Sequence, residues 1–386
     1  MAEKFRLLIL TNTISTFGGG EKLAFDMRNL LKEFKVTFTN PVSKIDLVRE
    51  NEAELLRQFG IPKEDVYKVE CVGIQRKAYG VEDYILMLPT PAGIAALADA
   101  IKNSDAIYCM TNNPFLLSIS IFYSKLYKSK FVFGVQQPLF TKLFEANGLA
   151  VSLYRSVLGQ IKYYHVLNSY EEGLINKDFP NAITYPIPGF IKAGNNKPKQ
   201  SKEFVVMFAG RQMRHEKGID LLCEIIEKTI KKNQAIKFKI VGAKGDGAPL
   251  IETLAKKYPK NVSALGFIPA KQVREEWASA SVALLTSRNE ELRYFPLVFL
   301  ESQSFGLPLV TFKGKGYYSI LTDAIQGTMV KSYDTNAASD AILKYYQRFK
   351  KSRSEYFEMK KKIATLNKRV YGEETIIPQM VKMFKD

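Results

Sequence analysis

The sequence of 386 residues is poor in cysteine, histidine and tryptophan, with three, two and one of them. An odd number of cysteines (Cys71, Cys109 and Cys223) without close spacing argues against a disulfide framework and against a zinc site. No apolar run approaches the roughly 18 residues of a membrane-spanning helix. The apolar run near the N-terminus is too short for a signal peptide and is more typical of a first strand. These absences favour a cytoplasmic protein.

Three ligand-binding motifs are also missing. No G-x-x-x-x-G-K-[ST] occurs, and VGAKGDG at 241–247 does not match the dinucleotide pattern G-x-G-x-x-G. This excludes a P-loop protein and counts against an NAD enzyme. No Asp-x-Asp occurs either, although enzymes that hold a nucleotide sugar through a divalent metal commonly need paired carboxylates. The sequence therefore predicts no metal site.

The composition is that of a globular protein with an uneven charge. Apolar residues make up 46% and aromatic residues 12% of the chain, which is enough to build a core. The formal net charge is +17, of which residues 1–195 (22 Lys+Arg, 19 Asp+Glu) contribute +3 and residues 196–386 (34 and 20) contribute +14. Such a surplus suits a polyanion, an anionic membrane or a phosphorylated ligand, or it is a solvated lysine-rich surface.

Strand and helix patterns alternate along the chain, interrupted by a Pro-, Gly- and Lys-rich segment at 185–204 that is typical of a linker. The alternation predicts two α/β domains with parallel sheets. The carboxyl ends of such strands are where ligands bind. The predicted strands are 5–10, 35–40, 106–110, 130–135 and 162–169 before the linker, and 204–210, 238–242, 262–267, 281–287 and 308–312 after it; helices are expected at 21–34, 218–232, 249–258, 270–279, 297–305 and within 339–386.

The loop GRQMRHEKG (210–218) is the strongest candidate site. Gly210 ends a predicted strand, and Lys217 with the glycine after it opens a helix. Arg211 and Lys217 both lie in this loop, at the carboxyl edge of the sheet and near a helix N-terminus, where anions bind. A guanidinium fork and an ammonium point charge suit a diphosphate.

A second candidate is SRNEELRYFPLVFLESQSFGLPLV (287–310). Pro296 is favourable at a first helical position, so the N–H groups of Leu297 and Val298 would point out of the helix end toward a ligand. Carboxylates here, Glu301 among them, could accept hydrogen bonds from sugar hydroxyls.

Glycine-rich turns form the third and fourth candidates. Gly18, Gly19 and Gly20 follow the first strand, and Gly242 ends the strand at 238–242. Glycine lets the backbone approach a ligand closely. A flexible turn is the alternative interpretation.

With these motifs the chain resembles glycosyltransferase family 4, whose members are retaining enzymes with the two-domain GT-B fold. The resemblance implies two Rossmann-like parallel-sheet domains facing across a cleft. Residues 1–190, with a C-terminal helix at 373–386 that crosses back, would bind the acceptor, and residues 191–372 the nucleotide sugar. The Gly18–Gly20 loop would lie beside the donor. Gly210, Arg211 and Lys217 match the family's G-R…K-G loop, which holds the donor diphosphate.

Further residues are assigned by the resemblance alone. It places Phe267 and Ile268 beside the nucleotide base and Glu301 on the ribose. The family's other glutamate is matched by Glu290 only if three residues are inserted, and Glu291 is the alternative. Where the family often has a histidine, this sequence has Gln136, which can donate a hydrogen bond to a sugar but cannot act as an acid or base.

The resemblance implies a metal-independent hexosyltransferase whose co-substrate is a nucleotide-diphosphate sugar and whose acceptor is a glycan or a lipid-linked molecule, with no other cofactor.

Residues 106–144 contain no acidic residue and four lysines, and 115–130 suits an interfacial amphipathic helix as well as a core-facing one. Peripheral association with the inner, anionic membrane face is therefore a hypothesis. The alternatives are an inactive family member and a basic α/β protein that binds polyanions through 344–369. Nucleic acid is disfavoured because no binding motif occurs.

Overall fold

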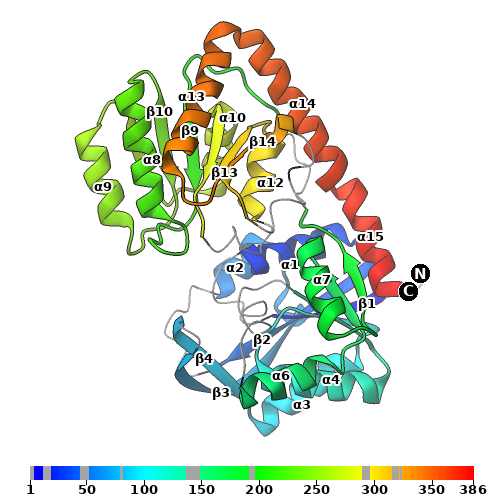
Figure 1. Ribbon diagram of the computed structural model, residues 1–386. Helices are drawn as coiled ribbons and strands as arrows, with labels where there is room; N and C mark the ends of the chain where they lie inside the picture. Colours follow the sequence, from blue (N-terminus) through cyan, green and yellow to red (C-terminus); the bar gives the residue numbers. More distant parts are fainter. Residues whose placement is uncertain are drawn as a thin grey trace. The chain divides into compact units, whose positions relative to one another are not determined.

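The computed structural model describes residues 4–11, 19–43, 52–78, 81–135, 148–190, 196–288, 296–314, 321 and 324–386. Contacts divide the chain into two compact units (Figure 1). The first comprises Met1–Ile187 together with Ile377–Asp386, and the second comprises Pro188–Ile376. Each unit contains one sheet covered by helices.

The first unit is built on an eight-stranded sheet in the order β4-β3-β2-β1-β5-β6-β7-β8. Neighbouring strands are parallel except β3 and β4. The last four residues of β1 are buried, as expected for a short apolar strand inside a parallel sheet. The strands are β1 (Phe5–Leu10), β2 (Phe34–Val42), β3 (Val66–Ala78), β4 (Val81–Pro89), β5 (Ala106–Cys109), β6 (Lys130–Gly134), β7 (Tyr163–Val166) and β8 (Ile183–Pro186). The helices are α1 (Gly19–Leu30), α2 (Glu52–Gln58), α3 (Pro91–Lys102), α4 (Pro114–Tyr127), α6 (Leu149–Leu158) and α7 (Ser169–Asp178).

The structure corrects three local expectations in this unit. The hairpin β3–β4 adds an antiparallel edge that the sequence analysis did not predict. Strand β8 begins before and runs into the predicted linker; Pro186 is tolerated because β8 is an edge strand. The helix predicted at 21–34 ends at Leu30, since Phe34 is needed as the buried first residue of β2.

The second unit has six parallel strands in the order β11-β10-β9-β12-β13-β14. Its β9 and β12 lie side by side at the centre, so the loops that follow them share one sheet edge. The strands are β9 (Val205–Ala209), β10 (Lys237–Val241), β11 (Val262–Gly266), β12 (Val282–Leu285), β13 (Leu309–Phe312) and β14 (Gly327–Val330). The helices are α8 (Ile219–Lys232), α9 (Ala248–Lys257), α10 (Ala270–Ser279), α12 (Leu297–Ser304), α13 (Thr335–Lys351) and α14 (Arg353–Tyr371).

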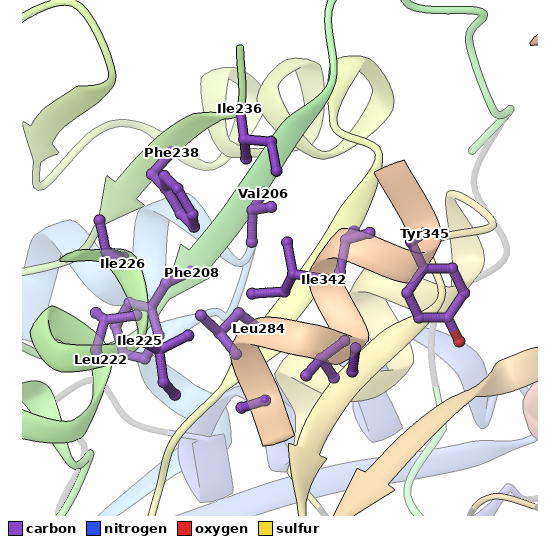
Figure 2. Packing of buried hydrophobic residues seen from close by; sticks show 14 of the residues in the cluster. Val206, Phe208, Leu222, Ile225, Ile226, Ile236, Phe238, Leu284, Ile342 and Tyr345 are labelled. Carbon is purple, nitrogen blue, oxygen red and sulfur yellow. The ribbon is translucent and has the colours of Figure 1, made fainter. Parts of the chain in front are cut away.

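The core of the second unit fixes α8 to the central strands. Leu222, Ile225 and Ile226 recur at helical spacing on the buried face of α8 and meet Phe208 of β9 and Ile342 of α13 in one cluster (Figure 2). A fully buried side chain of this size contributes roughly 1.5–3 kcal/mol. This packing holds the start of α8, and with it the loop after β9, in a fixed place.

The last helix, α15 (Glu373–Lys385), begins in the second unit and from Ile377 onward belongs to the first. Its Phe384 ring lies 6.0 Å from the ring of Phe34 and 5.7 Å from that of Tyr108. The expected crossover of the C-terminal helix is thereby confirmed. Within the described ranges, no helix has both the length and the apolar character that a bilayer crossing requires.

Candidate active site

The loop that links β9 to α8 is held by glycines where two backbones touch. Gly218 caps α8 with φ +61°, and a Cβ there would come 2.2 Å from the carbonyl oxygen of Thr286. Gly242 has φ +144°, and a Cβ there would come 1.8 Å from the carbonyl oxygen of Gly210. Only glycine tolerates both the conformation and the space. The loops after β9, β10 and β12 are therefore drawn together at one edge of the sheet.

Two cationic side chains of this loop converge. Arg211 Nη2 lies 3.1 Å from Glu216 Oε1, and Lys217 Nζ lies 3.7 Å from the same oxygen. Arg211 is 66% exposed, whereas Lys217 is only 17% exposed. A carboxylate oxygen thus occupies a position that both cations reach, and the predicted binding of a diphosphate there stays a prediction. Glu216 was not singled out from the sequence.

The N-terminus of α12 lies at the same edge because it follows β12. Pro296 has φ −71° and ψ 119° and is the residue before the helix. The prediction that it occupies the first helical position is therefore wrong by one residue. Its extended ψ places it outside the helix, so Leu297 is the first helical residue. Proline offers no capping side chain, and the first N–H groups of a helix have no acceptor within the helix. The N–H groups of Leu297 and Val298 are thus suited to an anion. Glu301 is half-buried in the second turn.

The turn after β11 carries the residues predicted to lie beside a nucleotide base. Gly266, at φ +64°, accepts a hydrogen bond from the N–H of Gly242. Phe267 follows and is 80% exposed, while Ile268 is half-buried. An exposed aromatic ring at this position can stack on a planar base, so the structure is compatible with the predicted role.

The candidate residues of the first unit are less completely described. Gly19 and Gly20 form the first turn of α1, whereas the sequence analysis placed them in the preceding loop. Gly18 and Gln136 of this unit lie outside the described residues, as do Glu290 and its alternative Glu291 of the second unit. Their predicted contacts with the sugar stay predictions.

His165 has no role as an acid or base. Its ring is fully buried, with Nδ1 2.6 Å from the hydroxyl of Tyr108 and Nε2 2.7 Å from the carbonyl oxygen of Ile187. Burial lowers the pKa of His165 to about 4, so the ring is neutral at physiological pH. It accepts a hydrogen bond from Tyr108 and donates one to Ile187, which is a structural arrangement.

Two residues after β12 that the sequence analysis did not single out bind the Arg211–Lys217 loop. Thr286 Oγ1 donates a hydrogen bond to the carbonyl oxygen of Lys217 over 2.8 Å. The backbone N–H of Arg288 donates one to the carbonyl oxygen of Glu216 over 3.0 Å. Arg288 appeared in the sequence only as part of S-R-N-E. No local pattern marks it, because its partners lie about 70 residues earlier.

Metal ligands are not gathered anywhere in the described ranges. No group of three or more His, Cys, Asp or Glu side chains there could hold a metal ion.

Comparison with known proteins gives a consistent result. Residues 203–348 match the family "Glycosyl transferases group 1". The GPI3 subunit of the phosphatidylinositol N-acetylglucosaminyltransferase of Saccharomyces cerevisiae is 26% identical over 177 residues, which are 40% of this chain and 38% of that protein. AmsD, an amylovoran biosynthesis glycosyltransferase of Erwinia amylovora, is 30% identical over 46% of each chain. The chain thus spans less than half the length of these relatives.

Solved structures resemble the whole chain. TarM of S. aureus, crystallised with fondaparinux, α-GlcNAc-glycerol and UDP, has a TM-score of 0.73 and 13% identity over 99% of this chain and all of its own. HepE of Anabaena, in complex with UDP, has a TM-score of 0.73 and 14% identity over 98% of this chain and 99% of its own. The GT-B architecture expected from the sequence is confirmed.

Proposed function

We propose that this chain, a GT-B protein of the group 1 glycosyl transferases, moves a hexose from a nucleotide-diphosphate sugar to a glycan or lipid-linked acceptor, with retention and without a metal. The observation that carries the proposal is the convergence of Arg211 and Lys217 on one anionic oxygen, at 3.1 and 3.7 Å, beside the start of α8. Both relatives named above are glycosyltransferases by name, which supports the same reaction class.

The chemistry follows from charge. Breaking the sugar–phosphate bond leaves positive charge on the sugar and negative charge on the diphosphate. Arg211, Lys217 and the N–H groups of Leu297 and Val298 would stabilise the leaving diphosphate, replacing the cation that other enzymes recruit. The family resemblance implies that a donor phosphate oxygen takes the proton from the acceptor on the same face. No side chain is then needed as a base, which is compatible with Gln136 in place of a histidine.

The first test is a thermal-shift panel of UDP, GDP, ADP and their sugars. Binding to the native state stabilises it by about 2.7 kcal/mol when the ligand is at 100 times its dissociation constant, and the melting temperature rises accordingly. We expect one nucleoside diphosphate to stabilise the protein, with or without Mg²⁺.

Donor hydrolysis without acceptor would separate an active enzyme from an inactive family member. If no nucleotide shifts the melting temperature, and random DNA binds in a salt-dependent way, the polyanion-binding alternative would be favoured.

For the acceptor, we propose a lipid-linked molecule reached at an anionic membrane surface. Helices α4 and α6 contact one another and expose large apolar side chains: Phe115 (40%), Phe122 (62%), Leu126 (58%), Leu149 (79%) and Leu153 (61%). Lys125 and Lys128 lie exposed at the end of α4, and neither helix contains a carboxylate. An apolar face bordered by cations suits an anionic bilayer. The GPI3 relative is, by name, a subunit of an enzyme that acts on phosphatidylinositol, which agrees with this proposal.

Vesicle sedimentation tests the membrane proposal. We expect the full-length protein to sediment with phosphatidylglycerol-containing vesicles, and the double variant Phe122→Ser/Leu153→Ser to bind about tenfold more weakly, since about 1.4 kcal/mol of lost apolar burial suffices. Val72→Ser, on β3 and 55% exposed, is the matched control. Equal sedimentation of the double variant and the wild type would contradict the proposal, as would failure of the wild type to sediment.

A further inference from the structure

We propose that Arg288 is a positioning residue that turns the carbonyl groups of the loop 214–217 away from the donor, so that Arg211 and Lys217 face its diphosphate. This rests on the proposed function, because it assigns how the diphosphate site of that function is kept in shape. Arg288 itself is not placed on the ligand.

Four consecutive carbonyl oxygens of the loop are bound from the end of β12. Arg288 Nη1 donates to those of Arg214 over 3.1 Å and His215 over 3.4 Å. The Arg288 backbone N–H donates a hydrogen bond to the next carbonyl oxygen, that of Glu216, and Thr286 Oγ1 donates one to the last, that of Lys217. Two residues of one strand end therefore fix the direction of every peptide unit between Arg214 and Gly218.

The charge of Arg288 is already compensated. Asp220, in the first turn of α8, accepts from both ends of the guanidinium, at 2.9 and 2.8 Å. This contact is the main cause that lowers the pKa of the Asp220 carboxyl. The Arg288 guanidinium also lies 5.5 Å from the ring centre of Tyr333 and is 19% exposed. A bidentate pair of this kind fixes geometry as well as charge. Arg288 thus acts on the loop through its direction and contributes little net charge to a ligand.

The carbonyl direction matters because each peptide unit is a dipole. Oxygen atoms that turned toward a diphosphate would repel it, whereas oxygen atoms that are bonded to the residues after β12 are held in another direction. The same bonds tie the loop after β9 to the residue that leads out of β12. A small displacement of this loop would move the Lys217 ammonium, and a misplacement of about 1 Å can cost about 100-fold in rate.

Arg288→Gln tests the inference, since it removes the fork and the charge and leaves a shorter, neutral polar side chain. We expect affinity for the nucleoside diphosphate that stabilises the wild type (UDP, GDP or ADP) to fall by about 10- to 100-fold, the range typical of residues that orient a binding group. Affinity for the matching nucleoside, which has no phosphate, should change less than about twofold. Isothermal titration of both ligands measures this ratio, and circular dichroism verifies folding.

Three further proteins make the test specific. Thr286→Val removes one of the four carbonyl bonds and should produce a smaller loss in the same direction. Arg6→Gln breaks a matched bidentate pair with Asp105 in the other unit and should leave both affinities unchanged. In the Lys217→Ala background, Arg288→Gln should cost much less than it does in the wild type, because the residue acts through Lys217.

The outcomes separate this inference from the function it rests on. If the wild type binds no nucleoside diphosphate, the proposed function fails. If the wild type binds one and Arg288→Gln binds it equally well, or loses nucleoside and diphosphate affinity in equal proportion, the positioning role is overturned while the function stands. Should Arg288→Gln not fold, the Thr286→Val result alone decides, and an unchanged diphosphate-to-nucleoside ratio would again overturn it.

Discussion

Lys217→Ala is expected to lower turnover by about 100- to 1,000-fold while the fold persists. The loss corresponds to about 2.7–4 kcal/mol of transition-state stabilisation, the size found when one preorganised donor to a developing anion is removed. Lys217 is only 17% exposed and is held at a fixed loop position, so water cannot replace its charge fully. Steady-state kinetics with the donor identified by the thermal-shift panel would measure the effect.

The opposite end of the same helix offers a matched control. Lys232 ends α8, forms an exposed ion pair with Asp340, and is remote from the loop that precedes the helix. Lys232→Ala should therefore retain turnover within about twofold, as exposed pairs contribute at most about 1 kcal/mol to stability. Near-normal turnover of Lys217→Ala would refute the assignment of the diphosphate site.

The second large effect concerns stability. Glu171 lies at the start of α7, is 1% exposed, and accepts one hydrogen bond from the N–H of Leu167 over 2.7 Å. Burial raises the pKa of Glu171 to about 8, although that hydrogen bond lowers it. Its folded pKa is thus above the model-compound value of 4.5. The folded state binds more protons than the unfolded state between these values, so the stability from this group is present below pH 4.5 and is lost as pH rises to 8.

Glu171→Gln should therefore become more stable than the wild type as pH rises. The full shift corresponds to about 5 kcal/mol at pH 8, at about 1.4 kcal/mol per pKa unit, and this is an upper limit because an amide group must still be buried. Urea unfolding at pH 4.5, 6 and 8 measures the difference. His165 titrates over an overlapping range in the opposite sense and cancels when the two proteins are compared. A difference that does not change with pH would contradict the assignment.

Much of the architecture was predictable because it is encoded locally. Apolar runs such as FRLLIL and FVVMFAG mark buried parallel strands, and α8 shows its apolar face through the spacing of Leu222, Ile225 and Ile226. The hairpin β3–β4 was not predicted, since an edge strand with mixed polarity gives no strong period. The end of strand β8 was assigned to the linker because the segment 185–204 is rich in Pro, Gly and Lys, and only the place of β8 at the sheet edge makes Pro186 harmless.

The candidate site divides in the same way. The sequence by itself determined that Arg211 and Lys217 flank a strand-to-helix loop. The apolar strand before the loop, its glycines and the helical periodicity after it all lie close together in the sequence. Only the tertiary structure decided that both cations reach the same oxygen of Glu216. It also decided that a side chain at position 242 would clash with the carbonyl oxygen of Gly210, and that Arg288 binds the loop from the end of a neighbouring strand. The reason is physical: β9 and β12 become neighbours through crossovers, so their loops meet across more than 70 residues of chain that no local pattern records.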